Sequence, residues 1–245
     1  MRLYWRALAI GAGLPVCVPL HYLSKALLRR SDWPRVFLAH AGRCCGLRVR
    51  VEGQPLRARV LYAANHVSWL DILAIGGSAP AVFIAKDEVA RWPVISWLAG
   101  LNDTIYVARA ARRQARDQAE QLRAALVAGR AVAFFPEGTT EGGREVLPFR
   151  PSLFGAIFPP IEGVKVQPVA IDYGEMTPQI AWTGEESTGA NARRVMNELG
   201  RIDMTVRFLP PIDPREAGDR KTLAERARAE IVAALDASAR DADPL

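Results

Sequence analysis

The chain has 245 residues, 50% of them hydrophobic and 24% charged, which excludes a disordered or fibrous protein and fits one α/β domain or two small ones. Its three cysteines, two of them adjacent at Cys44 and Cys45, exclude a disulfide scaffold, and no CxxC motif marks a zinc or redox site. The net charge of +6 predicts an anionic partner: nucleic acid, a membrane surface or a phosphorylated substrate.

The positive charge is concentrated in the first quarter of the chain. Residues 1–60 hold eleven basic and two acidic residues, a charge of +9, whereas the rest hold 21 basic and 24 acidic residues, a charge of −3. Such an asymmetry indicates an N-terminal segment that attaches the protein to an anionic partner, followed by a functional domain.

An apolar tract runs from Ala7 to Leu23 with basic residues on both sides. About 17 residues is the lower limit for a spanning helix, and Pro15 and Pro19 would kink or break one. Aromatic residues bracket the tract, as at membrane interfaces. We predict a retained, helical membrane anchor over residues 1–33, either re-entrant or lying in the interface, with basic residues facing anionic headgroups. A buried core helix is the alternative. A signal peptide is disfavoured because the tract has no clear cleavage site.

Residues 34–245 fit one α/β domain. Short runs rich in apolar, β-branched or aromatic residues predict strands over 60–64, 81–85, 104–107, 131–135, 164–171 and 204–209. Helical spacing predicts helices over 71–75, 88–101, 110–128 and 221–238. This alternation predicts an α/β sandwich, with a mostly parallel or mixed central sheet flanked by helices and mixed pairing near the end of the chain.

The first candidate site follows the strand predicted over 60–64 and reads Asn65-His66-Val67-Ser68-Trp69-Leu70-Asp71. Functional groups collect where strands of α/β sheets end, and histidine titrates near neutral pH, which suits proton abstraction. On a continuous helix, five positions turn a side chain about 140° away. His66 and Asp71 can therefore meet only if His66 precedes the helix. The alternative is structural, with Ser68 and Asp71 as a capping box and His66 as a loop residue.

Two more segments follow predicted strands. The first, Phe134-Phe135-Pro136-Glu137-Gly138-Thr139-Thr140, offers backbone N–H groups and hydroxyls as an anion or polyol cradle, although it lacks the Gly-Lys-Ser/Thr of a nucleotide P-loop. Glu137 would there accept a hydrogen bond from a hydroxyl or orient the loop. The second, Tyr106-Val107-Ala108-Arg109, ends on a guanidinium that could hold a phosphate. Each segment alone also fits an ordinary turn at a strand end.

Together these segments resemble the lysophospholipid acyltransferase family, the glycerolipid acyltransferases that include 1-acylglycerol-3-phosphate acyltransferase. Asn65-His66-x-Ser68-x-x-Asp71 matches the first block of the family, Tyr106 to Arg109 its second, and Phe135 to Thr139 its third. The run from Val164 to Ile171, which contains Pro168, looks like the fourth. Order and spacing agree over residues 60–171.

The resemblance implies a glycerolipid acyltransferase-like sandwich and a membrane-associated O-acyltransferase. His66 would be the general base on the acceptor hydroxyl, and Asp71 would orient its ring. The hydroxyl oxygen would attack the thioester of acyl-CoA or acyl-carrier protein, with no acyl-enzyme, metal or other cofactor. The implied headgroup-binding residues are Arg109, Glu137, Gly138, Thr139 and Arg150, and the supporting residues are Asn65, Ser68 and Pro168.

Two departures from the family pattern bear on the acceptor. Thr140 stands where the family often has Arg, and Arg150 stands where Lys is common. One cation fewer weakens the case for a phosphate monoester, and family members that acylate lyso-ornithine lipid, which lacks phosphorus, look similar here. We expect lysophosphatidic acid, the commoner acceptor, because Arg109 and Arg150 are both present. Lyso-ornithine lipid is the alternative.

Two other classes of function compete with this interpretation. A catalytically silent lipid-binding membrane protein has no chemical reason to keep both His66 and Asp71. A nucleic-acid binder is disfavoured because the basic excess lies beside an apolar tract and not on an aromatic-lined sheet. We therefore expect a membrane-associated enzyme on the cytoplasmic face of the inner or plasma membrane, with a lysolipid acceptor and an acyl thioester as its partners.

Overall fold

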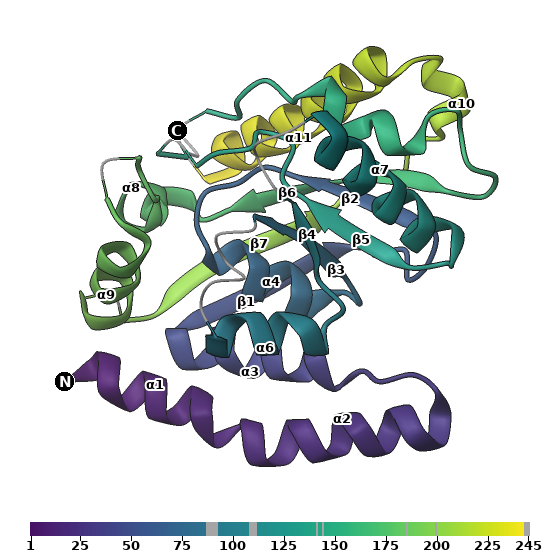
Figure 1. Cartoon of the computed structure of the whole chain (residues 1–245). Helices are drawn as coiled ribbons and strands as arrows, with labels where there is room; N and C mark the ends of the chain where they lie inside the picture. The colour runs from purple at the N-terminus through teal and green to yellow at the C-terminus, as the bar shows by residue number, and fades with distance from the viewer. Residues whose placement is uncertain are drawn as a thin grey trace.

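A single mixed sheet organises the chain (Figure 1). The structure is a computed structural model and describes residues 1–86, 93–107, 112–140, 142–143, 145–184, 186–198 and 200–242. Its strands are β1 (Leu47–Gly53), β2 (Val60–Ala64), β3 (Val82–Lys86), β4 (Ile105–Val107), β5 (Ala131–Phe134), β6 (Lys165–Asp172) and β7 (Ile202–Phe208). Its α-helices are α1 (Arg2–Ala12), α2 (Leu14–Leu28), α3 (Trp33–Cys45), α4 (Leu70–Ser78), α6 (Pro93–Leu101), α7 (Arg112–Val127), α8 (Thr177–Ile180), α9 (Thr188–Glu198), α10 (Pro214–Ala217) and α11 (Arg220–Ala242). Two 3-10 helices are η1 (Pro151–Ile157) and η2 (Gly174–Met176).

The sheet has the strand order β1-β7-β6-β2-β5-β3-β4. The five strands from β6 to β4 run parallel to one another, with Ala63 of β2 opposite Pro168 of β6 on one side and Phe134 of β5 on the other. β7 is antiparallel to β6, and β1 is parallel to β7. The predicted α/β sandwich with a mostly parallel, mixed sheet is confirmed, and the change of direction lies near the end of the chain, as expected.

The central strand β2 is buried on both faces. Alternate residues of a strand point to opposite sides of the sheet. Tyr62 and Ala64 pack into the apolar cluster formed with α3 and α4, whereas Leu61 and Ala63 pack into the cluster formed with α7, η1 and α11. Figure 1 shows these helices as two layers with the sheet between them. The carboxyl end of β2 is therefore held rigidly at the centre of the molecule.

Each predicted strand is present within two residues of its expected bounds. The predicted helices correspond to α4, α6, α7 and α11, although residues 87–92 and 108–111 lie outside the described part of the chain. β1 was not predicted, because its sequence Leu-Arg-Val-Arg-Val-Glu-Gly carries three charges and most of it is exposed at the sheet edge. α3 and α9 were not predicted either.

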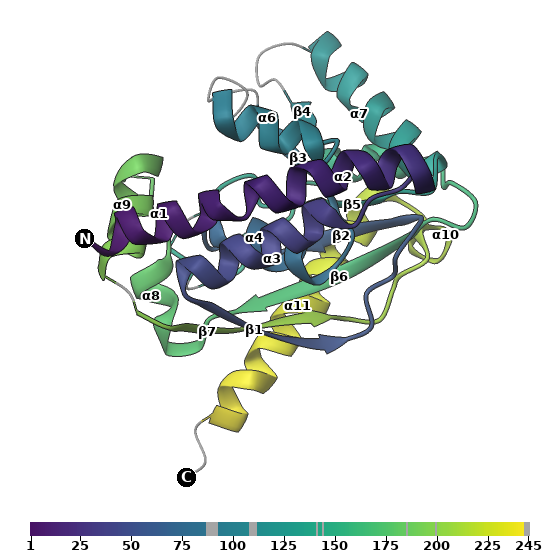
Figure 2. The same cartoon turned by 90° about the horizontal axis from the view of Figure 1, so that it is seen from below.

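The N-terminal helices α1 and α2 lie end to end along the outside of α3 (Figure 2). The Arg6 guanidinium donates hydrogen bonds to the backbone carbonyls of Val195, Met196 and Gly200, at 3.3, 3.1 and 2.8 Å. Nε2 of His40 in α3 lies 2.8 Å from the carbonyl oxygen of Ala9. These polar contacts fasten α1 to the α/β domain along its length.

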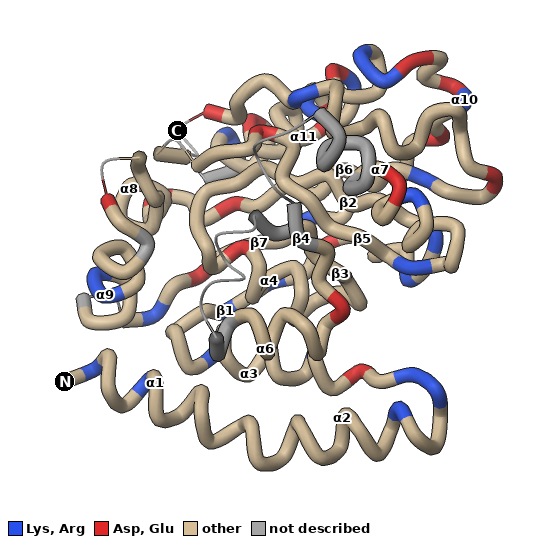
Figure 3. The backbone as a smooth tube through the Cα atoms, in the orientation of Figure 1, with Lys and Arg blue, Asp and Glu red and all other residues tan. Residues whose placement is uncertain are grey.

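The outward side of α1 and α2 is apolar. The span Arg2–Leu28 has a mean hydropathy of 1.5 over its most apolar window and is long enough to cross a membrane. Its large exposed hydrophobic residues are Tyr4, Trp5, Leu8, Val16, Tyr22, Leu23, Leu27 and Leu28. Figure 3 shows basic positions at both ends of the helix pair and a long stretch without charge between them.

Candidate active site

His66 and Asp71 meet at the carboxyl end of β2. His66 lies in the turn that joins β2 to α4, and Asp71 is the second residue of α4. His66 Nδ1 lies 2.8 Å from Asp71 Oδ2, and the side chains are 16% and 0% exposed. The required bend between them is therefore present. Because the carboxylate occupies Nδ1, and no described residue bonds to Nε2, the second ring nitrogen is available to exchange a proton with a bound molecule.

The Asp71 carboxylate accepts four hydrogen bonds from described residues. Besides His66, the backbone N–H groups of Val67 and Ser68 donate to Oδ2, at 2.7 and 2.9 Å. The hydroxyl of Tyr173 donates to Oδ1 at 2.7 Å. These donors compensate the burial of the charge and fix the plane of the carboxylate, so that it can orient the ring of His66.

The capping box expected at this helix start is only partly formed. Asp71 accepts from the backbone N–H of Ser68, as the acidic partner of a capping box does. The Ser68 hydroxyl is fully buried and lies 3.5 Å from the backbone nitrogen of Leu70. Asp71 thus serves the helix start and the imidazole with one carboxylate oxygen.

Phe135 lies flat against the imidazole of His66. The two ring centroids are 3.9 Å apart and the planes differ by 14°. Because Phe135 directly follows β5, the sheet neighbour of β2, two adjacent strands deliver both rings. The stacking covers one face of the imidazole and restricts its rotation.

Glu137 connects the His66 turn with the segment after the third motif. Its Oε1 accepts the backbone N–H of His66 at 2.7 Å, and its Oε2 accepts the backbone N–H of Leu147 at 2.9 Å. The side chain is 4% exposed, and this burial raises the pKa of Glu137 to about 7, although the two N–H groups lower it. Both carboxylate oxygens are therefore engaged by backbone.

Two of the expected headgroup-binding residues, Gly138 and Arg150, lie against each other. Gly138 has a φ of +75°, and a Cβ there would stand 2.9 Å from the guanidinium carbon of Arg150. Arg150 is exposed, and no hydrogen bond or ion pair ties its side chain to another described residue. Thr139 is partly exposed beside them. Arg109 lies outside the described residues.

Asn65 and Pro168 support the end of the sheet. Asn65 Nδ2 donates to the carbonyl of Ile171 at 3.0 Å, and its Oδ1 accepts the N–H of Ile171 at 2.7 Å. This pair of bonds extends the contact between β2 and β6 beyond the strand. Pro168 accepts a backbone hydrogen bond from Leu209 at 3.0 Å, just before β6 begins to pair with β7 at Val169. A proline has no N–H to donate to a ladder, and it is tolerated here because the ladder with β7 begins one residue later.

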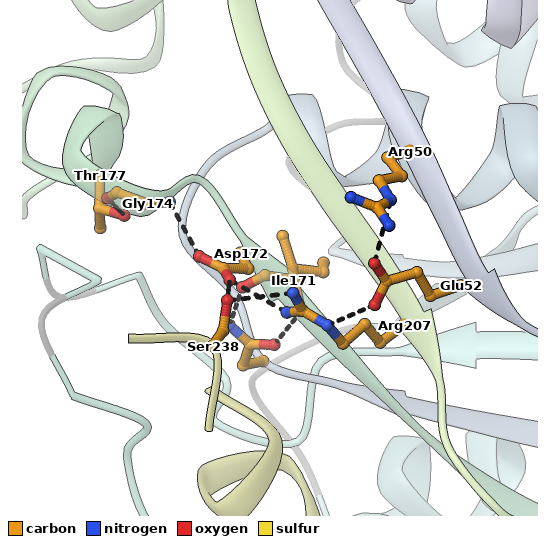
Figure 4. A network of polar contacts seen from close by, with 9 residues as sticks. Arg50, Glu52, Ile171, Asp172, Gly174, Thr177, Arg207 and Ser238 are labelled. Atoms are coloured by element: carbon orange, nitrogen blue, oxygen red, sulfur yellow. Dashed lines mark hydrogen bonds and ion pairs between the residues drawn. The ribbon is translucent and has the colours of Figure 1, made fainter. Parts of the chain in front are cut away.

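A charged network lies at the carboxyl end of β6 (Figure 4). Arg207 of β7 donates to Glu52, Asp172 and Ser238, at 2.7, 3.0 and 3.0 Å, and so joins β1, β6 and α11. Burial raises the pKa of Asp172, but the hydrogen bonds from Ser238, Gly174 and Arg207 outweigh that effect and lower it. The residue after Asp172 is Tyr173.

The sequence predicted the motif residues, but it assigned no role in the site to Phe135 and did not point to Tyr173. Tyr173 follows the fourth motif directly, and a buried tyrosine hydroxyl generally requires a partner, which was the available signal. In the part of the chain that the structure describes, no group of three or more His, Cys, Asp or Glu side chains could hold a metal.

The region that contains this site is similar to known proteins. A family model described as Acyltransferase matches residues 48–172, which include every candidate site residue and end one residue before Tyr173. The chain is 36% identical to a lyso-ornithine lipid O-acyltransferase of Brucella abortus, over 89% of each protein. It is 33% identical to a protein of the same name from Pseudomonas aeruginosa, over 93% of this chain and 88% of that one.

Two further similar proteins are named for a different activity. The chain is 34% identical to a 1-acyl-sn-glycerol-3-phosphate acyltransferase of Neisseria gonorrhoeae, over 75% of this chain and 71% of that one. Its fold is similar to the crystal structure of the 1-acyl-sn-glycerophosphate acyltransferase PlsC of Thermotoga maritima, with a TM-score of 0.65 and 24% identity, over 96% of this chain and 97% of that one.

Proposed function

The chain belongs to the acyltransferase family and is an acyltransferase, and from this premise we propose that it acylates the free hydroxyl of a lyso-ornithine lipid. The similarity to lyso-ornithine lipid O-acyltransferases carries the proposal, because it extends over 89% and 93% of the chain in two of them. The sequence alone had favoured lysophosphatidic acid.

In the proposed reaction, Nε2 of His66 takes the proton of the acceptor hydroxyl while the hydroxyl oxygen bonds to the thioester carbonyl carbon. The tetrahedral intermediate collapses, the carbon–sulfur bond breaks, and the thiol leaves with a proton returned by the imidazolium. Asp71, 2.8 Å from Nδ1, stabilises the imidazolium in between. The acyl donor is acyl-CoA or acyl-carrier protein, and the step needs no acyl-enzyme.

The headgroup of the acceptor would lie at the loop after β5. Arg150, over Gly138, offers a guanidinium to the carboxylate of an ornithine headgroup, and Thr139 a hydroxyl. Arg109 remains a proposed headgroup ligand from the sequence motif. Glu137 was proposed either to contact the acceptor or to orient its loop, and its two backbone hydrogen bonds support the second role.

Lysophosphatidic acid is the second candidate acceptor. The relative from Neisseria gonorrhoeae, named for acylation of 1-acylglycerol 3-phosphate, is 34% identical to this chain. A guanidinium binds phosphate as well as carboxylate, so Arg150 is compatible with either headgroup.

We further propose that α1 and α2 lie in the membrane interface on its cytoplasmic side. The contacts of Arg6 and His40 keep α1 along the domain surface, which supports a helix in the plane of the membrane over one that crosses it. The exposed aromatic and aliphatic side chains would face the acyl chains, and the basic residues at both ends would face anionic headgroups.

An acceptor screen tests this function. Purified protein receives lyso-ornithine lipid, lysophosphatidic acid or another lysolipid, with acyl-CoA or acyl-carrier protein as donor, and thiol release and the acylated lipid are measured. We expect the highest kcat/KM with lyso-ornithine lipid. Turnover of lysophosphatidic acid alone would contradict the proposed acceptor.

Variants of the histidine–aspartate pair test the mechanism. His66→Gln and Asp71→Asn should each lower kcat by roughly a thousandfold or more, because one removes the base and the other presents an amide N–H to Nδ1 and favours the wrong tautomer. His40→Gln is the matched control, since His40 contacts α1 outside the site. A folded His66→Gln variant with wild-type turnover would refute the proposed base.

A further inference from the structure

Tyr173 holds the side of Asp71 that faces away from His66. Its hydroxyl donates to Asp71 Oδ1 at 2.7 Å, whereas the imidazole and the two backbone N–H groups all use Oδ2. Among the described residues, the hydroxyl is the one donor to Oδ1. Tyr173 is buried directly after β6, in the apolar cluster that also contains Tyr62 of β2.

We propose that Tyr173 is a positioning residue for acyl transfer, which holds the Asp71 carboxylate in the orientation and charge distribution that His66 requires as a base. This inference deepens the proposed function and rests on it, because it takes His66 as the base. Nothing in the motifs assigns a role to position 173.

The physical reason lies in the charge that develops on His66. When the imidazole takes a proton, the neighbouring carboxylate must stabilise the positive ring without moving. A donor already fixed on Oδ1 helps because it holds the carboxylate in place, so that the carboxylate needs no reorganisation at that moment. Burial, together with the charge of Asp71, raises the pKa of Tyr173 well above its ordinary value, so the hydroxyl keeps its proton.

The two residues before Tyr173 in the chain are fixed. Ile171 is bonded twice to Asn65, the residue before His66. Asp172 points to the opposite side of the strand, where Arg207, Ser238 and the N–H of Gly174 all donate to it (Figure 4). The backbone that leads into Tyr173 is therefore held both to the turn that carries His66 and to α11.

Other charged groups act on the same cluster. Glu137, from the loop after β5, faces the backbone of His66, and the Asp71 charge raises its pKa. Arg228 of α11 lowers the pKa of Glu137 and donates to the carbonyls of Val146 and Leu147. These groups are retained in the variants below, so a change in pH dependence reports on the tyrosine hydroxyl.

The kinetic test compares Tyr173→Phe with Tyr62→Phe. Tyr62 is an equally buried tyrosine, and its hydroxyl donates to the carbonyl of Leu56, which lies outside the candidate site. With an acceptor that the wild type acylates, we expect kcat of Tyr173→Phe to fall roughly 10- to 100-fold, as for loss of one hydrogen bond to a charged group. KM for acceptor and donor should change less than about twofold, because the hydroxyl is buried and donates to Asp71.

The pH profile separates positioning from mere packing. Without the donor on Oδ1, the carboxylate holds a proton or an imidazolium more strongly, so the acid limb of kcat should move to higher pH in Tyr173→Phe. Tyr62→Phe should keep the wild-type profile. A folded Tyr173→Phe enzyme with kcat within about twofold of wild type and an unmoved profile would overturn the proposal.

Two measurements keep the test decisive if Tyr173→Phe folds poorly or if no acceptor is turned over. The chain has only three histidines, so the downfield proton NMR signal of the His66–Asp71 hydrogen bond can be assigned as the one lost in His66→Gln. We expect this signal to shift in Tyr173→Phe and not in Tyr62→Phe, whichever lipid the enzyme uses. An unmoved signal would contradict the positioning role, whereas absence of acyl transfer by wild type would contradict the proposed function alone.

A rescue variant completes the design. 4-Aminophenylalanine at position 173 retains an N–H donor near the place of the hydroxyl, whereas 4-methylphenylalanine fills the same space without one. Activity and the NMR signal should approach wild type with the amino group and not with the methyl group. Equal activity of the two variants would mean that volume alone matters at this position.

Discussion

The Glu137 carboxyl group is ionisable in a place where a charge is costly. It is 4% exposed, and burial raises its pKa from about 4.5 to about 7, against the opposing effect of two backbone N–H donors. Below its unfolded pKa, the group is protonated in both the folded and the unfolded protein. Between the two values, the folded protein retains a proton that the unfolded chain releases, so stability falls as pH rises through this window.

Glu137→Gln should remove that dependence. We expect the free energy of unfolding of wild type, relative to the variant, to fall by about 3 kcal/mol from pH 4 to pH 8. Denaturant unfolding at a series of pH values measures it. Glu186→Gln is the control with the opposite sign, because hydrogen bonds from Arg194 lower the pKa of Glu186. A constant difference between wild type and Glu137→Gln would contradict the raised pKa.

At the residue scale, sequence spacing gave the condition under which His66 and Asp71 could meet, and the resemblance to the family implied that they act together. The contact with Tyr173 joins residues 102 positions apart, and no local pattern encodes such a distance. The stacking of Phe135 on His66 was hidden for the same reason: it arises because β2 and β5 are neighbours in the sheet.

At the scale of elements, α1 and α2 have two different sides, one packed against the domain and one apolar and exposed. Cys17 and His21 are buried on the inner side, whereas Trp5, Leu8 and Leu27 are among the most exposed apolar residues of the described chain. No described residue covers this apolar surface. It gains free energy only by leaving water.

Charges placed on that surface should release the protein from membranes. The double change Leu8→Asp and Leu27→Asp removes two side chains that would each contribute about 1.5–3 kcal/mol on burial, so vesicle partitioning should fall at least a hundredfold. Vesicle sedimentation measures it. Val127→Asp is the control, because Val127 is an exposed apolar residue at the end of α7. Equal loss in both variants would contradict a specific membrane-facing surface, as would full binding of a chain that lacks residues 1–30.

The elements that the sequence predicted well are those with one clear pattern. β2, β5 and β6 are buried on both faces and appear as short apolar runs. β1 escaped prediction because its alternating arginines belong to an edge that faces water, and only its pairing with β7 makes it a strand. α3 begins at Trp33, at the boundary predicted between the anchor segment and the α/β domain, and no helix was predicted there.

For the whole molecule, the separation of charge predicts how the protein would bind to the proposed membrane surface. Arg2, Lys25, Arg29 and Arg30 are exposed at the ends of the α1–α2 pair (Figure 3). Each basic residue near an anionic surface contributes about 1 kcal/mol, and salt screens this attraction.

Binding to anionic vesicles should therefore weaken several-fold or more when salt is raised from about 0.1 M to about 0.5 M. Binding to vesicles of neutral lipid should remain weak and nearly unchanged, since only the apolar surface acts there. Sedimentation of the same protein with both kinds of vesicle provides the comparison. Partitioning that ignores salt on anionic vesicles would assign attachment to the apolar surface alone.

The bonds that fasten α1 also bear on the order of synthesis. Arg6 binds carbonyls of Val195, Met196 and Gly200, some 190 positions later in the chain. At roughly 5–20 residues per second, the ribosome reaches these partners roughly 10–40 s after Arg6 is made. The apolar helix pair thus emerges long before its docking surface exists. We expect the nascent chain to meet the bilayer first and to complete its sheet there.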